Sequence, residues 1–325
     1  MLHVESTTTL RRDLQATAME YAAETAQGMF IADRVCPACT VEQQAAEYPV
    51  WLRENFLDIA DGSRTEDGAY NRISSRLGSL NYATEEYGFE QSLDDRKRAR
   101  WASLLDWEQQ ATRSEVHRLL LARERRAAAV VNDSSTFTAV SADTIWSTHA
   151  SAVPLTDIGT GLTALELRTG LPRSLISVIM PQGDFINCVS CTQVRDLLKY
   201  TFNSNDGIQP HLVTPAQLAT ILGVKEVLVG MGGYNTANEG LTASISAIWT
   251  AGHVTLAYLA SPGDPIDAMS AFRTMRWRDD TPEDIVVETY RDNKVRADVV
   301  RVREEADEVA TAEADLMNYL IDTTP

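Results

Sequence analysis

The longest regular segment of the sequence, residues 92–131, predicts one helical rod. Ser92 with Asp95 three positions later resembles a capping box, and polar residues follow Val131. The stretch from Glu108 to Val131 would span about 36 Å, whereas an average helix has only about 11–12 residues. Apolar residues recur at helical spacing, namely Trp101, Leu104, Leu105, Val116, Leu119, Leu120, Ala127 and Val131. Any fold for this chain must therefore accommodate an unusually long helix.

The opposite face of this predicted helix is densely charged. It carries five arginines and three glutamates: Arg113, Arg118, Arg123, Arg125, Arg126, Glu108, Glu115 and Glu124. One interpretation is a solvated face with ion pairs between neighbouring turns. The other is a surface that pairs with another subunit, because arginine is enriched at interfaces. The sequence leaves both open.

Residues 46–91, which precede the rod, predict a long projecting β-hairpin. Tyrosine, valine and tryptophan in EYPVWLRENFL are followed by the polar tip DIADGSRTEDG and two further strand-like runs. An isolated two-stranded ribbon is marginally stable in water, so we expect this loop to pack on another subunit. The candidate interface residues of the loop and the helix are Trp51, Arg53, Arg64, Arg72, Arg76, Glu108 and Arg123.

The remaining segments predict an α+β protein. Residues 1–45 form an arm without a core of their own, and residues 92–153 contain the rod. Residues 154–272 alternate helical and strand patterns, which predicts an α/β or α+β domain. Residues 273–325 predict a hairpin around Asp292–Asn293 and a final acidic helix over 304–321. The apolar stripe of that helix would be Val309, Ala312, Leu316 and Leu320.

Composition excludes several classes of function. The 325 residues include 29 Lys and Arg against 46 Asp and Glu, a net charge of −17. This balance argues against a dedicated nucleic-acid binder and against attachment to anionic membranes. Only four of the cations are lysines. No apolar run is long enough for a membrane helix, and the first residues do not resemble a secretory signal.

Two Cys-x-x-Cys pairs are the sharpest local chemical signal. Cys36, Cys39, Cys188 and Cys191 could supply four thiolates to zinc if the fold brought the pairs together. The alternative is that they are small apolar residues of a core. The first pair also matches a thioredoxin-type motif, but no βαβ unit follows it. The glycines of Gly230–Gly233 lack the remainder of a nucleotide-binding signature.

The order of these parts resembles the tailed-bacteriophage major capsid protein, which has the Hong Kong 97-like fold. The passage FIADRVCPACTVEQQAAEYPVW is similar to the segment that leads from the arm into the extended loop of that family. Further similarities are NYATEEYGFEQSLDD, LLLARERRAAAVV, RTGLPRSLISVIM and LGVKEVLVGMGGYNTANEG, in the family's order. The resemblance implies an N-terminal arm at 1–45, an extended loop at 46–91 and a peripheral domain with a spine helix at 92–153. An axial domain at 154–272 would follow, and 273–325 would return to the peripheral domain.

The resemblance also implies a function. We expect a structural coat protein, not an enzyme, with no metal or cofactor. It would assemble in the host cytoplasm into hexamers and pentamers of an icosahedral virion capsid enclosing weakly contacted double-stranded DNA, without a membrane. Portal and decoration proteins are further expected partners.

Two features limit what the resemblance implies. Residues 46–91 contain no lysine, so the isopeptide cross-link that some family members form from this loop is unavailable. The similarity begins close to Met1, so we expect an uncleaved chain with a separate scaffolding protein or none. The alternatives are an encapsulin-like nanocompartment shell and a zinc- or thiol-dependent protein using the two Cys-x-x-Cys pairs.

Overall fold

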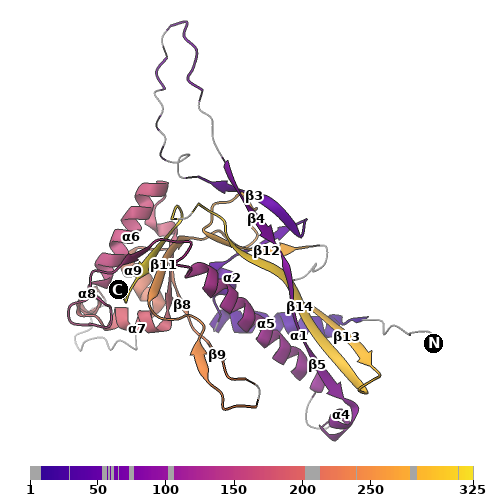
Figure 1. The fold of residues 1–325 in the computed structure, drawn as a ribbon. Coiled ribbons are helices and arrows are strands. Elements are labelled where there is room, and N and C mark those ends of the chain that lie inside the picture. The colour runs from indigo at the N-terminus through magenta and orange to yellow at the C-terminus, as the bar shows by residue number, and fades with distance from the viewer. Residues whose placement is uncertain are drawn as a thin grey trace.

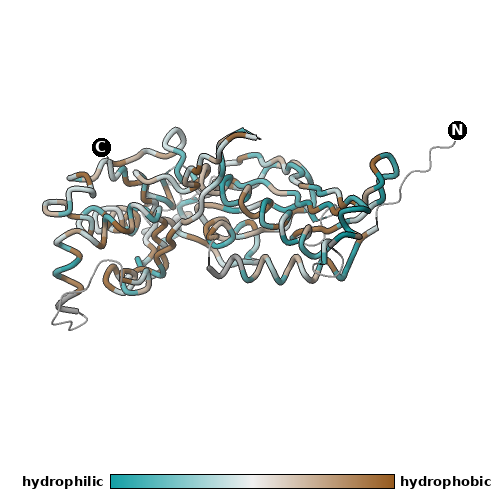
Figure 2. The backbone as a smooth tube through the Cα atoms, turned by 90° about the horizontal axis from the view of Figure 1, so that it is seen from below, coloured by the Kyte–Doolittle hydropathy of each residue, from teal (hydrophilic) through white to brown (hydrophobic). Residues whose placement is uncertain are grey.

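The computed structural model describes residues 9–28, 30–52, 57, 59, 62–64, 66–72, 77–101, 106–201, 213–238, 240–278, 284–313 and 315–324. Two sheets lie at opposite ends of an elongated, flat body, and one hairpin projects from its edge (Figures 1 and 2). Each sheet has its own helices and its own buried apolar cluster.

The first sheet is built around one long central strand. Strand β14 (Ala297–Ala310) pairs with β13 (Val286–Asp292) and then β12 (Phe272–Trp277) along one edge, and with β5 (Glu85–Asp94) along the other. The outer strands come from the N-terminal arm: β1 (Thr9–Leu10) pairs with β13, and β2 (Ala38–Val41) pairs in parallel with β12. The arm therefore supplies both edge strands of a sheet whose central strands lie some 240–280 positions further along the sequence.

Two helices cover this sheet. Helix α1 (Arg12–Gly28) packs on α5 (Trp107–Val131), and α5 lies along β14 (Figure 1). The buried cluster between them includes Leu14, Ala18, Val116, Leu119, Val287, Val300 and Val302. Asp106 caps α5 by accepting hydrogen bonds from the backbone N–H groups of Glu108 and Gln109.

The predicted rod is confirmed from Trp107 to Val131, but its expected start is wrong. Ser92 lies in β5, opposite Val299 of β14, and a separate short helix α4 (Asp95–Trp101) follows. Asp94 caps α4 by accepting from the N–H groups of two of its residues. Long-range pairing with β14 determined the structure here, because residues 92–94 continue a ten-residue ladder that a helix starting at Ser92 would cut short.

The second sheet has the strand order β6 (Ala139–Ser141), β15 (Asn318–Asp322), β11 (His253–Tyr258), β7 (Ile176–Pro181) and β8 (Glu226–Gly230). Around it are α6 (Pro154–Thr169), the 3-10 turn η1 (Arg173–Leu175), α7 (Gln182–Ser190), α8 (Thr192–Thr201) and α9 (Pro215–Leu222). Residues 154–272 thus alternate helices and strands, as the sequence predicted.

The predicted C-terminal helix over 304–321 is wrong. Strand β14 continues to Ala310, and β15 lies between β6 and β11 of the second sheet. The helical stripe was misleading because Glu304 and Glu308, which a surface helix would expose, are buried and paired with arginines of α5. A strand places residues 304 and 308 on the same face, so both carboxylates can meet one helix.

Smaller elements complete the fold. Helix α2 (Ala32–Val35) links α1 to β2, and β9 (Gly233–Asn235) and β10 (Ile245–Ala247) form a small hairpin. The projecting hairpin consists of β3 (Ala45–Trp51) and β4 (Leu77–Ala83), paired antiparallel (Figure 1).

Candidate assembly surface

The base of the projecting hairpin is fixed to the first sheet. Tyr48 donates its hydroxyl proton to the carbonyl oxygen of Ala310 at 2.7 Å, and Tyr82 donates to that of Gln43 at 3.0 Å. The two tyrosines pack with Val50 and with apolar residues of β2 and β12 in a small cluster. Burial raises the pKa of Tyr48 to about 12, so its hydroxyl stays protonated as a donor. The hairpin therefore leaves the body in one defined direction.

Beyond this base the loop exposes apolar side chains. Ile59 is 98% exposed and Tyr70 72% exposed, and Leu57 and Leu80 are a little under half exposed. Arg64 lies over the Tyr70 ring, with its Cζ 4.7 Å from the ring centroid. These exposed side chains extend away from the molecule's own core, as expected of a surface that another molecule covers.

The candidate interface residues of the loop differ in what the structure shows. Arg53 and Arg76 lie outside the described residues, and Trp51 is described only as the end of β3. Arg64 also donates to the carbonyl oxygen of Gly68 at 2.6 Å. Arg72 is exposed. Their role at an interface remains a prediction.

The structure contradicts the prediction that Arg123 lies at a subunit interface. Its side chain is only 4% exposed and is enclosed between α5, α2 and β14. It forms ion pairs with Glu304 and, at 3.0 Å, with Asp33. A side chain buried within its own chain cannot reach a neighbouring subunit, so the prediction for Arg123 as an interface residue is wrong.

Two arginines of the charged face of α5, Arg123 and Arg126, contact β14, whereas Arg113, Arg118 and Arg125 are exposed. Arg126 pairs with Glu308 at 2.7 Å and Glu304 at 2.8 Å, and it lies 3.7 Å from the centroid of the Tyr87 ring. Burial raises the pKa of Glu304, but the two arginines outweigh burial and hold it below its ordinary value. The Arg118–Glu115 pair at 2.9 Å, three positions apart, is of the kind that the solvated-face interpretation predicted, but neither interpretation anticipated the intramolecular network with β14.

Glu108 also binds residues of its own chain. Arg98 contacts it at 2.6 Å and Arg11 at 3.0 Å, so the carboxylate joins α5 to α4 and to the start of α1. The Glu108 side chain is 19% exposed. A contact between Glu108 and a neighbouring subunit remains a prediction.

Glu124 is a buried junction that no sequence pattern indicated. Its carboxylate accepts hydrogen bonds from the backbone N–H of Ile31 at 3.1 Å, from that of Ala32 at 2.8 Å and from the indole of Trp249 at 2.6 Å. Burial raises the pKa of Glu124, and these three donors oppose that effect. One carboxylate thus joins the arm, the long helix and the loop before β11.

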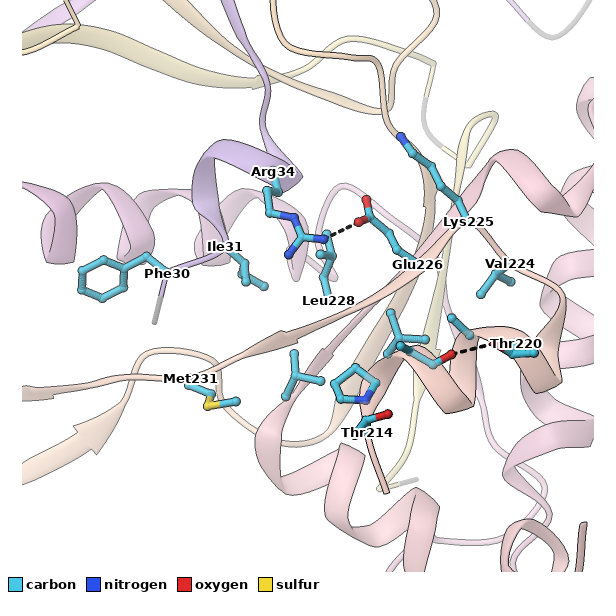
Figure 3. A pocket seen from close by; sticks show the side chains of 15 residues that line it. Phe30, Ile31, Arg34, Thr214, Thr220, Val224, Lys225, Glu226, Leu228 and Met231 are labelled. Carbon is cyan, nitrogen blue, oxygen red and sulfur yellow. Dashed lines mark hydrogen bonds and ion pairs between the residues drawn. The ribbon is translucent and has the colours of Figure 1, made fainter. Parts of the chain in front are cut away.

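Two grooves run along edge strands of the two sheets. One, of about 630 Å³, lies beside β8 (Figure 3). The consecutive residues 224–229 all line it, together with Phe30 and Met231. Successive side chains of a strand point to opposite faces, so the four consecutive β8 residues 226–229 can border one cavity only along the edge of the strand. Arg34 and Glu226 form an ion pair within it. A second groove of about 720 Å³ lies beside β2 and is lined by consecutive residues 38–43.

The four cysteines are buried thiols that do not gather into one ligand set. Cys36 and Cys188 belong to the core of the second sheet, whereas Cys39 lies in the cluster at the hairpin base. Burial raises the pKa of Cys188, and raises that of Cys191 to about 11, which is the opposite of thiolate activation. Within the described residues, no group of three or more His, Cys, Asp or Glu is arranged to hold a metal ion.

Comparisons with known proteins identify the fold. No family model and no curated protein matches the sequence. Among solved structures, a phage-related protein from Bordetella bronchiseptica matches with a TM-score of 0.71 at 18% identity, over 98% of each chain. The capsid of cyanophage P-SCSP1u matches with a TM-score of 0.56 at 9% identity, over 89% of this chain and 86% of that one. A virus-like particle from Pyrococcus furiosus matches with a TM-score of 0.55 at 9% identity, over 96% and 98%.

These similarities define the class of the molecule. The chain has the mixed α+β architecture of phage capsid proteins, the Hong Kong 97-like fold, and the fold class expected from the sequence is confirmed. The similarity extends over nearly the whole chain, from the arm strands to the second sheet. None of the described helices combines the length and the apolar character needed to cross a bilayer.

Proposed function

We propose that this chain is the structural coat subunit of a phage head and has no catalytic role. The observation that carries the proposal is the hairpin β3–β4, which is fixed at its base and exposes Ile59 and Tyr70 away from the body. The capsid fold supports it, because the solved capsids that share this fold are assembled shells.

Contacts between loop and body are the proposed means of assembly. A projecting loop of one copy resting on the body of the next is a head-to-tail contact, in which different surfaces of the two copies meet. Such contacts close into rings when the rotation between copies permits it. The rings proposed here are hexamers and pentamers of an icosahedral shell. Many weak contacts repeated around a closed shell add up to high stability.

The further details are inferences from the family. The shell would enclose double-stranded DNA, assemble in the host cytoplasm and join a portal, with scaffolding and decoration proteins as further partners. The domain boundaries expected from the sequence remain part of this proposal. Two strands outside residues 154–272, β6 and β15, pair in the second sheet, so we propose to move residues 139–141 and 318–322 to the axial domain and to keep the other boundaries.

A nanocompartment shell is the second candidate. The virus-like particle from Pyrococcus furiosus shares the fold at nearly the same TM-score as the cyanophage capsid. The contents of purified particles separate the two: nuclease-protected double-stranded DNA supports a phage head, and a stoichiometric protein cargo supports a nanocompartment.

Electron microscopy of the expressed chain tests the proposal directly. We expect closed particles from the wild type. Replacing residues 53–76 with a short Gly-Ser linker should leave the melting temperature nearly unchanged, because the contacts at the hairpin base remain, but should abolish particles. The double variant Ile59→Ser/Tyr70→Ser keeps the loop length and should weaken assembly by the same mechanism. Normal particles from the shortened loop would contradict the proposed role of the hairpin.

A further inference from the structure

One end of the molecule carries exposed cations that form no salt bridge. They are Arg96, Lys97 and Arg100 of α4, and Lys294 and Arg296 of the turn between β13 and β14. We call this set the basic end. The two segments touch, since the N–H of Asp95 donates to the carbonyl oxygen of Arg296 at 3.3 Å (Figure 1). Over the described residues, none of the five cations pairs with a carboxylate within 4 Å, although other arginines close by do so.

Two carboxylates near the basic end are already occupied by other arginines. Asp95 is held by both terminal nitrogens of Arg291, at 2.6 and 2.7 Å. Asp298 is held by Arg98 at 2.7 Å and by Arg291 at 3.0 Å. These ion pairs are themselves partly exposed, and they leave little charge on either carboxylate to neutralise the five cations.

The other two carboxylates cap backbone groups. Asp94 accepts from the N–H groups of Arg96 and Lys97 at the start of α4, and Asp292 accepts from that of Lys294 in the turn. They fix the local backbone and so hold the cationic side chains in place. Residues 94–100 and 291–298 contain seven Lys and Arg against four Asp, in a chain whose net charge is −17. Two of the chain's four lysines lie here.

The chemistry of the basic end favours phosphates over a protein surface. Protein interfaces have an apolar centre, but here the large apolar side chain exposed between the cations is Val295 alone among the described residues. A symmetric contact between two copies would also place the same cations against each other. Phosphate groups need only exposed cations, because the favourable free energy comes from releasing condensed counterions.

We propose that the basic end binds the phosphate backbone of double-stranded nucleic acid without reading its sequence. The proposal rests on the proposed function in one respect, because a shell would hold DNA against many copies of this surface. One copy offers about five phosphate contacts, which gives weak binding at physiological salt. Many copies facing one duplex would bind it through multivalency and still release it locally.

The test compares two triple variants with the same change in charge. Arg96→Glu/Arg100→Glu/Arg296→Glu alters the basic end. Arg113→Glu/Arg195→Glu/Arg278→Glu alters three exposed arginines elsewhere and serves as the control. Binding of each full-length protein to a fluorescent 20-base-pair duplex is measured by anisotropy over a salt series, with light scattering of the same samples to record assembly.

The wild type and the control should bind with similar salt dependence. The basic-end variant should bind at least about tenfold more weakly at low salt, with a slope of log affinity against log salt reduced by about 2.7 for three lost contacts. Equal binding by both triple variants, or no binding by the wild type at 50 mM salt, would overturn the proposal.

Assembly separates this proposal from the proposed function. If the basic-end variant fails to form particles while the control forms them, the basic end is a contact between subunits and the nucleic-acid proposal is wrong. If the wild type itself forms no particles, the proposed function fails, and the titration alone decides whether the basic end binds DNA.

Discussion

Trp249 donates its indole N–H to Glu124 at 2.6 Å, and this hydrogen bond joins the two halves of the molecule. Trp249 lies in the loop before β11 of the second sheet, and Glu124 lies in the long helix that covers the first. The same carboxylate holds the start of α2, so the arm is tied to both halves at one point.

Glu124→Gln should destabilise the protein measurably. An amide has one acceptor oxygen, and its NH2 group would face the N–H donors that the carboxylate now accepts. Leaving buried donors unsatisfied costs about 1–3 kcal/mol. Thermal denaturation should therefore show a lower melting temperature than for Glu20→Gln, an exposed control on α1. Identical melting of the two variants would show that the junction is not stabilising.

Glu304→Gln should have a larger effect, and one that depends on pH. Removing the carboxylate shared by buried Arg123 and partly buried Arg126 should lower the free energy of unfolding by about 3–5 kcal/mol at pH 7. Because the pKa of Glu304 is lowered in the folded protein, its contribution is present above the unfolded value of 4.5 and is lost as the pH falls through the folded value.

Urea denaturation at pH 7, 5 and 3.5 checks this. The difference between wild type and variant should stay constant down to about pH 5 and shrink below 4.5, since other groups are common to both proteins. Glu90→Gln removes a surface ion pair with Arg301 and should cost less than about 1 kcal/mol. A difference that grows on acidification would contradict the assignment.

Two glycine substitutions should have opposite signs. A Cβ at Gly230, at the end of β8, would overlap the indole ring of Trp249, so Gly230→Ala should cost about 1–3 kcal/mol. Gly159 lies within α6 with nothing within 4 Å of an added Cβ, so Gly159→Ala should stabilise by up to about 1 kcal/mol. Chemical denaturation measures the free energy of unfolding of both variants. A stabilising effect of Gly230→Ala would mean that the Trp249 ring does not pack against Gly230.

The cysteines should be unreactive in the native protein. All four thiols are buried and have raised pKa values. A thiol reagent at pH 8 should therefore react slowly with the native protein, and all four thiols should react quickly only after denaturation. A chelator should leave the melting temperature unchanged. About one zinc per chain, together with a lower melting temperature after chelation, would instead support the zinc hypothesis.

The sequence predicted those parts of the fold whose signals are local. Helix α5 has an aspartate cap and no glycine or proline within it, and α9 begins at Thr214–Pro215 and ends at Gly223. The projecting hairpin was visible as β-forming runs around a polar tip.

Contacts between distant residues were not predictable in this way. The pairing of Arg123 with Glu304 spans 181 positions, and neither residue alone indicates that it is buried. The pattern over 304–321 fits a helix as well as a strand until β5, β12 and β13 are known to flank β14. The basic end was missed for the same reason, because residues 96–100 and 294–296 are neighbours only once β5 pairs with β14.

The arm strands have a consequence for how the chain folds. Thr9 pairs with Thr289, and Ala38 with Thr274, so the first sheet closes over very long sequence separations. Folding slows as such separations grow, because the entropy of closing the loop is lost before the contact forms. Strands β1 and β2 are made long before their partners and are therefore among the last to be fixed, and the rate at which they find those partners would limit the supply of subunits competent to join a shell.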